Sequence, residues 1–151
     1  MSFGALLLAL HVLGTSVWVG GMFFALAVLR PGMAFLDHPQ RLALHQQVLR
    51  RFLFVLWHVM PVMLATGIAM TYLFYDGFGS APAPVLVMTA TGLGMAAMLV
   101  AIALGPWREL RRSLAQEDMA AADSALQRIR QLITASLALG VLTTVVAMLD
   151  D

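Results

Sequence analysis

The chain has 151 residues, of which 61% are hydrophobic and 11% are charged, and its formal net charge is +1. Because water-soluble domains usually carry about 25% charged residues, this composition excludes an ordinary soluble globular protein. The lack of cysteine excludes disulfides, thiolate metal sites and cysteine nucleophiles.

Four segments without any charged residue are long enough to cross a lipid bilayer. They are residues 3–29, 52–75, 85–107 and 132–149, and a membrane-spanning helix needs about 20 apolar residues. Because a chain inside a bilayer must satisfy its own backbone hydrogen bonds, we expect all four to be helices. The short connections favour antiparallel neighbours, so we predict an all-α integral membrane four-helix bundle, up-down-up-down, as one domain over residues 1–151.

The arginines predict which way these helices face. All nine basic residues are arginines, and they lie in or beside the first and third connections, whereas the second connection and both termini have none. The positive-inside rule therefore places the two arginine-rich connections in the cytoplasm and both termini in the periplasm. The cytoplasmic basic residues that we single out are Arg30, Arg50, Arg51 and Arg130, and Arg50 and Arg51 are candidates to meet anionic headgroups or a propionate.

The first span is expected to remain in the membrane rather than to be cleaved as a signal peptide, because no basic region precedes it. It carries a stripe at helical spacing that combines an ionisable ring with small residues: His11, Gly14, Trp18, Gly21 and Met22. Interfaces between helices in lipid are built from small residues, so we predict that this stripe faces the bundle. The glycines would then admit either a neighbouring helix or a flat ligand.

The second helix is predicted to begin at Asp37, with Pro39 in its first turn, and to continue into the membrane. Pro61 is expected to kink it close to His58. One stripe, which we expect to repeat the arrangement of the first span, contains Arg51, Phe54, His58, Pro61, Ala65, Ala69 and Tyr72. The third connection is predicted to be helical with a short break near "QED".

Histidines and methionines predict two candidate metal sites. The depth of each residue in the bilayer is estimated from the rise of a helix, about 1.5 Å per residue, and residues at similar depth are grouped. The outer site combines His11 with Met88 and Met95, and the inner site combines His58 with Met22. Neutral imidazole and thioether ligands suit Cu(I). The competing interpretation is structural, because methionine commonly fills gaps in packing and a neutral histidine can hydrogen-bond between helices.

The segments "LHVLGTSVWVGG", "RRFLFVLWHVMPVMLATGIAM" and "WRELRRSLAQEDMAAADSALQRIRQLITASLALGVLTTVVAML" resemble CopD-like copper-resistance proteins over nearly the whole chain. This resemblance implies a four-helix, multi-pass protein of the bacterial inner membrane that handles or takes up copper. It also implies a periplasmic copper-binding protein as a partner. The bilayer is the other expected partner, and a homodimer mate is considered because four short helices enclose little space.

The first two spans are also similar to HemJ-type protoporphyrinogen oxidases, which bind haem b. The matching positions are His11, Trp18, Gly21, Arg50, Arg51, Pro61, Thr66 and Gly67. By this resemblance His11 would be an axial haem ligand. For a haem protein we also consider Met95 as a possible second ligand. The function implied is electron transfer or tetrapyrrole oxidation.

The leading hypothesis is therefore a CopD-like membrane protein that binds or passes copper through its histidines and methionines. A haem b protein is the first alternative, and a structural accessory subunit of a membrane complex is the second. No catalytic residues are predicted, because no span contains a carboxylate and no serine is placed with a histidine and an acid. Nucleic-acid binding has no support, and the residues expected to shape packing or a pocket are Gly14, Trp18, Gly21, Pro61 and Gly67.

Overall fold

The computed structural model describes residues 2–148, and every regular element among them is helical. The predicted all-α bundle is therefore confirmed. The last residue of the fourth predicted span, Leu149, lies outside the described residues, as do both ends of the predicted domain. The elements are α1 (Phe3–Phe24), the π-helical turn η1 (Ala25–Leu29), α2 (Arg30–Gly32), α3 (His38–Tyr75), α4 (Ala83–Leu104), α5 (Pro106–Ala115) and α6 (Met119–Met148).

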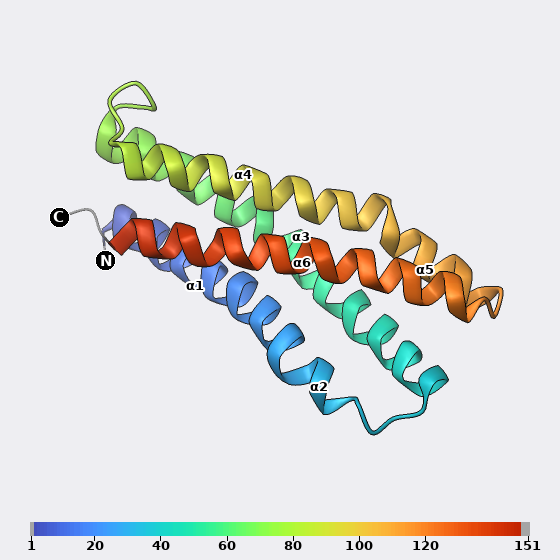
Figure 1. Ribbon diagram of the computed structural model, residues 1–151. Helices are drawn as coiled ribbons and strands as arrows, with labels where there is room; N and C mark the ends of the chain where they lie inside the picture. The colour runs from blue at the N-terminus through green and yellow to red at the C-terminus, as the bar shows by residue number, and fades with distance from the viewer. Residues whose placement is uncertain (1, 149–151) are drawn as a thin grey trace.

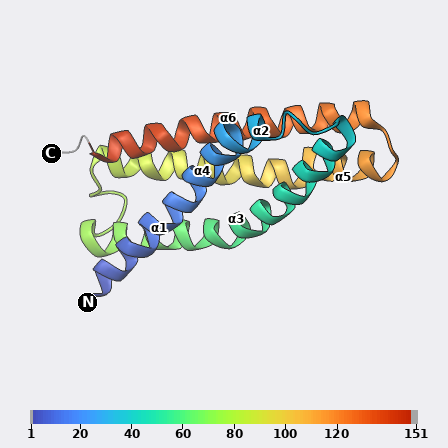
Figure 2. The ribbon, with the colours of Figure 1, turned by 90° about the horizontal axis from the view of Figure 1, so that it is seen from below.

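The long helices run alternately up and down, as Figure 1 shows. Helix α1 packs chiefly against α3, while α4 and α5 pack chiefly against α6. The molecule is thus two antiparallel helix pairs joined by a smaller contact. Figure 2 shows α1 crossing α3 obliquely, whereas α4 and α6 run in opposite directions with their axes nearly aligned.

Four helical segments are long and apolar enough to cross a membrane: Phe3–Gly32, His38–Tyr75, Ala83–Ala115 and Met119–Met148. Only 11% to 22% of their most apolar stretches is buried inside the chain. Large apolar side chains therefore cover the outer surface, which water would disfavour and lipid tails would accommodate. The chain is accordingly a multi-pass membrane protein.

Prolines lie at changes in the course of two helical segments. Helix α3 begins at His38 after Asp37, as predicted, although the Asp37 side chain makes no capping hydrogen bond. Pro31 has no N–H to donate and crowds the carbonyl four residues earlier, which accounts for the wide turn η1 before it. Figure 2 shows that α3 is bent along its length, and this helix contains Pro61 in its interior.

The third predicted span is interrupted, because α4 ends at Leu104 and α5 starts at Pro106. Gly105 lies between them with φ −108° and ψ −102°, outside the helical range. The predicted break near "QED" also occurs, since α5 ends at Ala115 and α6 starts at Met119. The helical connection therefore extends the α4–α6 pair beyond the apolar segments.

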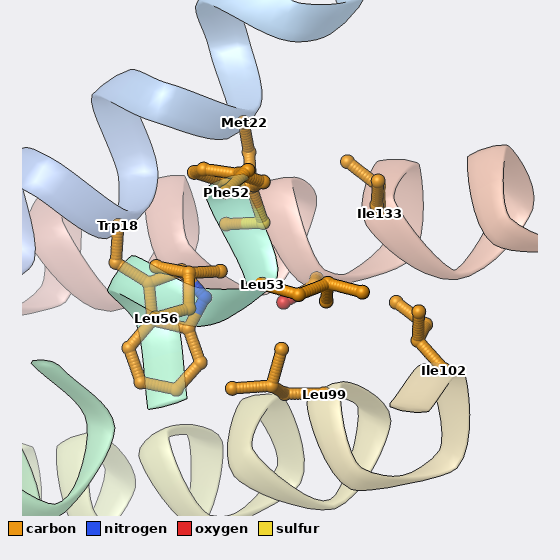
Figure 3. A pocket seen from close by; sticks show the side chains of 9 residues that line it. Trp18, Met22, Phe52, Leu53, Leu56, Leu99, Ile102 and Ile133 are labelled. Carbon is orange, nitrogen blue, oxygen red and sulfur yellow. The ribbon is translucent and has the colours of Figure 1, made fainter. Parts of the chain in front are cut away.

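The apolar core lies mainly in the half of the bundle that carries the arginines. A cavity of about 10 Å³ within it is bordered by α1, α3, α4 and α6, and Figure 3 shows Trp18 and Met22 of α1 beside it. Such a volume holds at most one water molecule. The core therefore offers no space for a large ligand at this point.

Candidate functional site

Glycines on α1 allow α3 to approach closely. A β-carbon added at Gly14 would lie 2.6 Å from Cγ of Met63, and one added at Gly21 would lie 2.5 Å from Cε2 of Phe52. Both distances are far below a normal carbon–carbon contact, so side chains of α3 occupy the space that the glycines leave. The structure thus places these two glycines in the contact between helices, where they admit a neighbour rather than a flat ligand.

His11 projects from α1 against α3, where Gly67 makes room for its ring. A β-carbon added at Gly67 would lie 3.2 Å from Cε1 of His11. The Nδ1 atom of His11 lies 3.1 Å from the carbonyl oxygen of Met63 and 3.1 Å from Oγ1 of Thr66. The ring is half-buried. The histidine therefore has protein neighbours inside the apolar part of the molecule, as its stripe predicts.

The partners of His11 assign the proton of its ring. A carbonyl oxygen can only accept a hydrogen bond, so the Met63 oxygen requires an N–H at Nδ1. Thr66 agrees with this tautomer, because its hydroxyl donates to the carbonyl oxygen of Val62 at 2.8 Å and has a lone pair left to accept. With the proton on Nδ1, the Nε2 atom carries the free lone pair.

The Nε2 atom of His11 is accessible and has no protein partner. Hydrogen bonds of the ring within residues 2–148 all involve Nδ1. In the same part of the chain, no enclosed side-chain nitrogen or oxygen lacks a hydrogen-bond partner. An unpartnered Nε2 must therefore reach the surface of the helix pair. This geometry leaves one oriented nitrogen lone pair free for a ligand.

Met63 is a site residue that the sequence interpretation missed. Its carbonyl oxygen holds His11, and its sulfur lies 3.9 Å from Oγ1 of Thr15, one helical turn along α1. The signal was present, because Leu49, Leu56, Met60, Met63 and Gly67 form a second stripe at helical spacing on α3. Thr66 and Gly67 entered the sequence interpretation through a resemblance, with no contact to His11 assigned.

Met95, one of the two expected outer partners of His11, lies elsewhere. A β-carbon added at Gly140 of α6 would contact Cγ2 of Val19 at 2.8 Å and Cε of Met95 at 3.2 Å, so Met95 lies level with Val19. Val19 follows His11 by eight residues on α1, which corresponds to about 12 Å along a helix. Met88 is half-buried on α4. The structure therefore does not bring Met95 to His11.

The expected inner site is not assembled either. Met22 is 2% exposed in the core, whereas His58 is exposed on the outer side of α3. The Nδ1 atom of His58 lies 2.8 Å from the carbonyl oxygen of Phe54 in its own helix, and its ring packs on the Phe54 ring at 4.6 Å between centroids. His58 thus makes local contacts and faces away from Met22.

The stripe of α3 that contains His58 faces outward, contrary to our expectation. Phe54 is 67% exposed and Tyr72 is 59% exposed, and Arg51, Pro61 and Ala65 are exposed as well. Among the residues expected to shape a pocket, Trp18 borders the small cavity and Pro61 does not face the bundle. The opposite face of α3, with Met63 and Thr66, is the one that packs on α1.

The donors that converge around His11 are few. Within residues 2–148, no three histidine or acidic side chains come together in a way that could hold a metal ion. A protein-only site of hard ligands is therefore not formed by the described part of the chain. The oriented imidazole of His11 and the thioether of Met63, in the same contact between α1 and α3, are soft, neutral donors, which suit a monovalent soft cation.

In a comparison with protein families, residues 46–149 match the family described as CopD, copper resistance protein D. The matched region contains most of α3 and the helices that follow, including Met63, Thr66 and Gly67, whereas His11 precedes it. Curated proteins and solved structures provide no match.

Proposed function

The chain belongs to the copper resistance protein D family, and we propose that it binds or passes copper inside the membrane with Nε2 of His11 as a ligand. The observation that carries this proposal is the orientation of the ring, whose Nδ1 lies 3.1 Å from the Met63 carbonyl oxygen. Histidines that bind metals commonly donate a hydrogen bond from the N–H of their other ring nitrogen in this way, which orients the ring and selects the tautomer.

Cu(I) is the ion that this position suits. Imidazole and thioether are soft and uncharged, so they match Cu(I) without requiring a carboxylate in the hydrocarbon. The four charge-free segments contain no carboxylate at all. The ion itself would bring the single positive charge, and the ring would stay neutral when it binds.

Met63 replaces Met95 as the sulfur ligand that we propose. Its thioether lies in the same contact between α1 and α3, where Cγ and Sδ fill the space left by Gly14. Met88, half-buried on α4, is the second methionine to test. With both termini in the periplasm of a bacterial inner membrane, His11 would lie in the periplasmic half and receive copper from that side.

Haem b does not fit this contact. A macrocycle between α1 and α3 would need an open slot, but Met63 and Phe52 fill the spaces beside Gly14 and Gly21. The cavity near Trp18 measures about 10 Å³, which is the size of one water molecule. The expected second axial ligand, Met95, lies about two helical turns from His11 along α1.

The test is copper retention by the protein purified in detergent. Protein loaded with Cu(I) under reducing conditions and freed of excess ion is analysed for copper per chain. We expect the wild type to retain copper and His11→Ala to lose nearly all of it, because the oriented nitrogen is gone. His58→Ala is the matched control, since it removes an imidazole that faces outward, and it should retain copper like the wild type.

Three other outcomes would overturn the proposal. Equal copper in His11→Ala and the wild type would show that His11 is not a ligand. A visible Soret band that disappears in His11→Ala would identify haem instead. Copurification of a partner complex, with neither metal nor haem in the chain, would favour the structural accessory role.

A further inference from the structure

Two buried polar side chains in the core make no hydrogen bond within the described part of the chain. Trp18 of α1 is 3% exposed and Ser136 of α6 is 4% exposed. Among residues 2–148, neither the indole nitrogen of Trp18 nor the hydroxyl of Ser136 has a protein partner. The hydroxyls of Thr134, Thr143 and Thr144 on the same helix α6 each donate to the carbonyl oxygen four residues earlier. The hydroxyl of Ser136 is therefore turned away from its own backbone.

Both side chains border the cavity of about 10 Å³ in the core, together with Met22. Figure 3 shows the indole nitrogen of Trp18 turned toward the other side chains that line this cavity. Within residues 2–148, no fully enclosed side-chain nitrogen or oxygen lacks a hydrogen-bond partner. The unpartnered atoms of Trp18 and Ser136 must therefore border open space, and the cavity is a space that the two residues share.

A close contact between α1 and α6 brings these two residues to the same level. A β-carbon added at Gly140 would lie 2.8 Å from Cγ2 of Val19. Val19 follows Trp18 directly, and Gly140 lies about one helical turn after Ser136. The cavity thus lies where the helix pair α1–α3 meets the helix pair α4–α6.

Lipid tails cannot supply the missing hydrogen bonds. Trp18 lies within the charge-free segment 3–29 and Ser136 within the charge-free segment 132–149, so hydrocarbon surrounds the bundle at this level. Hydrocarbon neither donates nor accepts hydrogen bonds, and an unpaired polar group in it is costly. A ligand small enough for the cavity must therefore satisfy these groups.

The chemistry of the lining matches one water molecule. The indole N–H of Trp18 is a donor, the hydroxyl of Ser136 donates and accepts, and the sulfur of Met22 is a weak acceptor. A buried water needs two to four polar partners and a cavity of about one probe sphere, roughly 10 Å³. The lining therefore provides both the number of partners and the volume that a buried water requires.

We propose that this cavity binds one water molecule, which links α1 to α6. The water accepts a hydrogen bond from Nε1 of Trp18 and donates one to Oγ of Ser136, and its second hydrogen faces the sulfur of Met22. The site is separate from His11 and does not depend on copper. Its role is to add a polar link inside the membrane between the helix pair α1–α3 and the helix pair α4–α6.

The test is nuclear magnetic resonance of the detergent-purified protein, isotope-labelled at its indole nitrogens and without added copper. The chain has three tryptophans, Trp18, Trp57 and Trp107, and Trp18→Phe identifies the signal of Trp18 by its loss. We expect the indole hydrogen of Trp18 to show a cross-relaxation peak with bound water. Ser136→Val places apolar carbon in the cavity and should abolish this peak.

Two further variants separate the bound water from other causes of the signal. Ser136→Ala removes the hydroxyl but leaves room for the water, which keeps Trp18 as a partner, so the peak should be retained. Ser113→Val is the matched control, because Ser113 is also a buried serine but lies on α5, which does not border the cavity. It should retain the peak as well.

Each result decides for or against the site. Loss of the peak in Ser136→Val, with retention in Ser136→Ala and Ser113→Val, supports the bound water. A wild type without the peak, or a peak that persists in Ser136→Val, overturns the proposal. Loss in Ser136→Ala would assign the signal to the serine hydroxyl, and loss in Ser113→Val to a general loosening of the bundle, and either overturns it. The wild type and Ser136→Ala decide the question even if Ser136→Val folds poorly.

Discussion

The contacts between α1 and α3 differ in kind from the contacts between α4 and α6. On the first pair, glycines admit large side chains, and His11 reaches the backbone of α3. On the second pair, Oγ1 of Thr143 donates to Oγ1 of Thr91 at 2.6 Å. The charge-free segments of that pair, residues 85–107 and 132–149, carry no ionisable side chain. The close approach of α1 and α3 therefore orients the ring of His11, whereas that of α4 and α6 allows a hydrogen bond between two hydroxyl groups.

The difference indicates where function and framework lie in this protein. The family match over residues 46–149 covers α4–α6 and most of α3. That region supplies the face that orients His11, through Met63 and Thr66. The ring itself belongs to α1, before the matched region. The proposed copper ligand is thus held by a framework that the family shares.

Filling a glycine on α1 should produce the largest change in stability. In Gly21→Ala the new carbon would meet the ring of Phe52 at 2.5 Å, and such overpacking typically destabilises by about 1–3 kcal/mol. Gly20→Ala is the neighbouring control, since nothing lies within 4 Å of its added carbon. Both changes raise helix propensity equally. Thermal unfolding in detergent should give a lower midpoint for Gly21→Ala than for Gly20→Ala.

Equal midpoints for the two alanine variants would contradict the close contact between α1 and α3. They would show that the ring of Phe52 moves aside without loss of packing. The α1–α3 pair would then not depend on its glycines, and its contrast with α4–α6 would disappear.

Removing the hydroxyl beside His11 should affect copper more than folding. Thr66→Val keeps the side-chain shape but takes away one of the two oxygens near Nδ1, and loss of such an orienting contact typically weakens metal binding about 10- to 100-fold. The loss here should be near the lower value, because the Met63 carbonyl oxygen remains. Competition with a chromophoric Cu(I) chelator measures the affinity.

Thr71→Val is the matched control for this change. Thr71 is also buried on α3, and its hydroxyl donates to the Gly67 carbonyl oxygen at 2.9 Å, whereas the ring of His11 bonds to Met63 and Thr66. Its variant should bind copper like the wild type. An equal loss of affinity in both valine variants would assign the effect to the helix rather than to the histidine.

The sequence predicted the helices and the inward-facing histidine but not the inner face of α3. Charge-free segments of this length have one stable form in a bilayer, which made the number and type of elements predictable. The stripe that contains Phe54 and His58 did not show which way it faces. Lipid tails are as apolar as leucine, so apolar side chains can face either the lipid or the other helices. Hydrophobic periodicity then cannot distinguish the buried face from the lipid face.

Ligand depth was also beyond the sequence. The expected grouping of His11 with Met95 assumed upright helices, but α1 crosses the bundle obliquely (Figure 2). Residue counts along a tilted helix overestimate depth, and Met95 lies level with Val19 instead. The angle at which two helices cross depends on which side chains pack between them, such as Met63 against Gly14. The spacing of residues along one helix does not predict this angle.

The smallest effect is expected from the hydroxyl contact of α4–α6. Thr143→Val removes a donor that Thr143 shares between Oγ1 of Thr91 and its own helix, at the Leu139 carbonyl oxygen, 2.7 Å away. Thr91 keeps its bond to the Val87 carbonyl oxygen at 2.8 Å, so no polar group is left unpaired. Hydrogen bonds between membrane helices contribute about 0.6 kcal/mol on average. We therefore expect the free energy of unfolding, measured by thermal unfolding in detergent, to decrease by an amount of that order.

The control for this change is Thr144→Val, whose hydroxyl bonds only within α6, to the Gly140 carbonyl oxygen at 2.9 Å. Copper affinity should be unchanged in both variants, because neither residue contacts His11. A loss in Thr143→Val well above about 1.7 kcal/mol, the upper end for such bonds, would mean that one hydroxyl pair holds α4 to α6. Small-residue packing, as at Gly140 against Met95, would then not suffice for this pair, and the two pairs would both depend on a single polar contact.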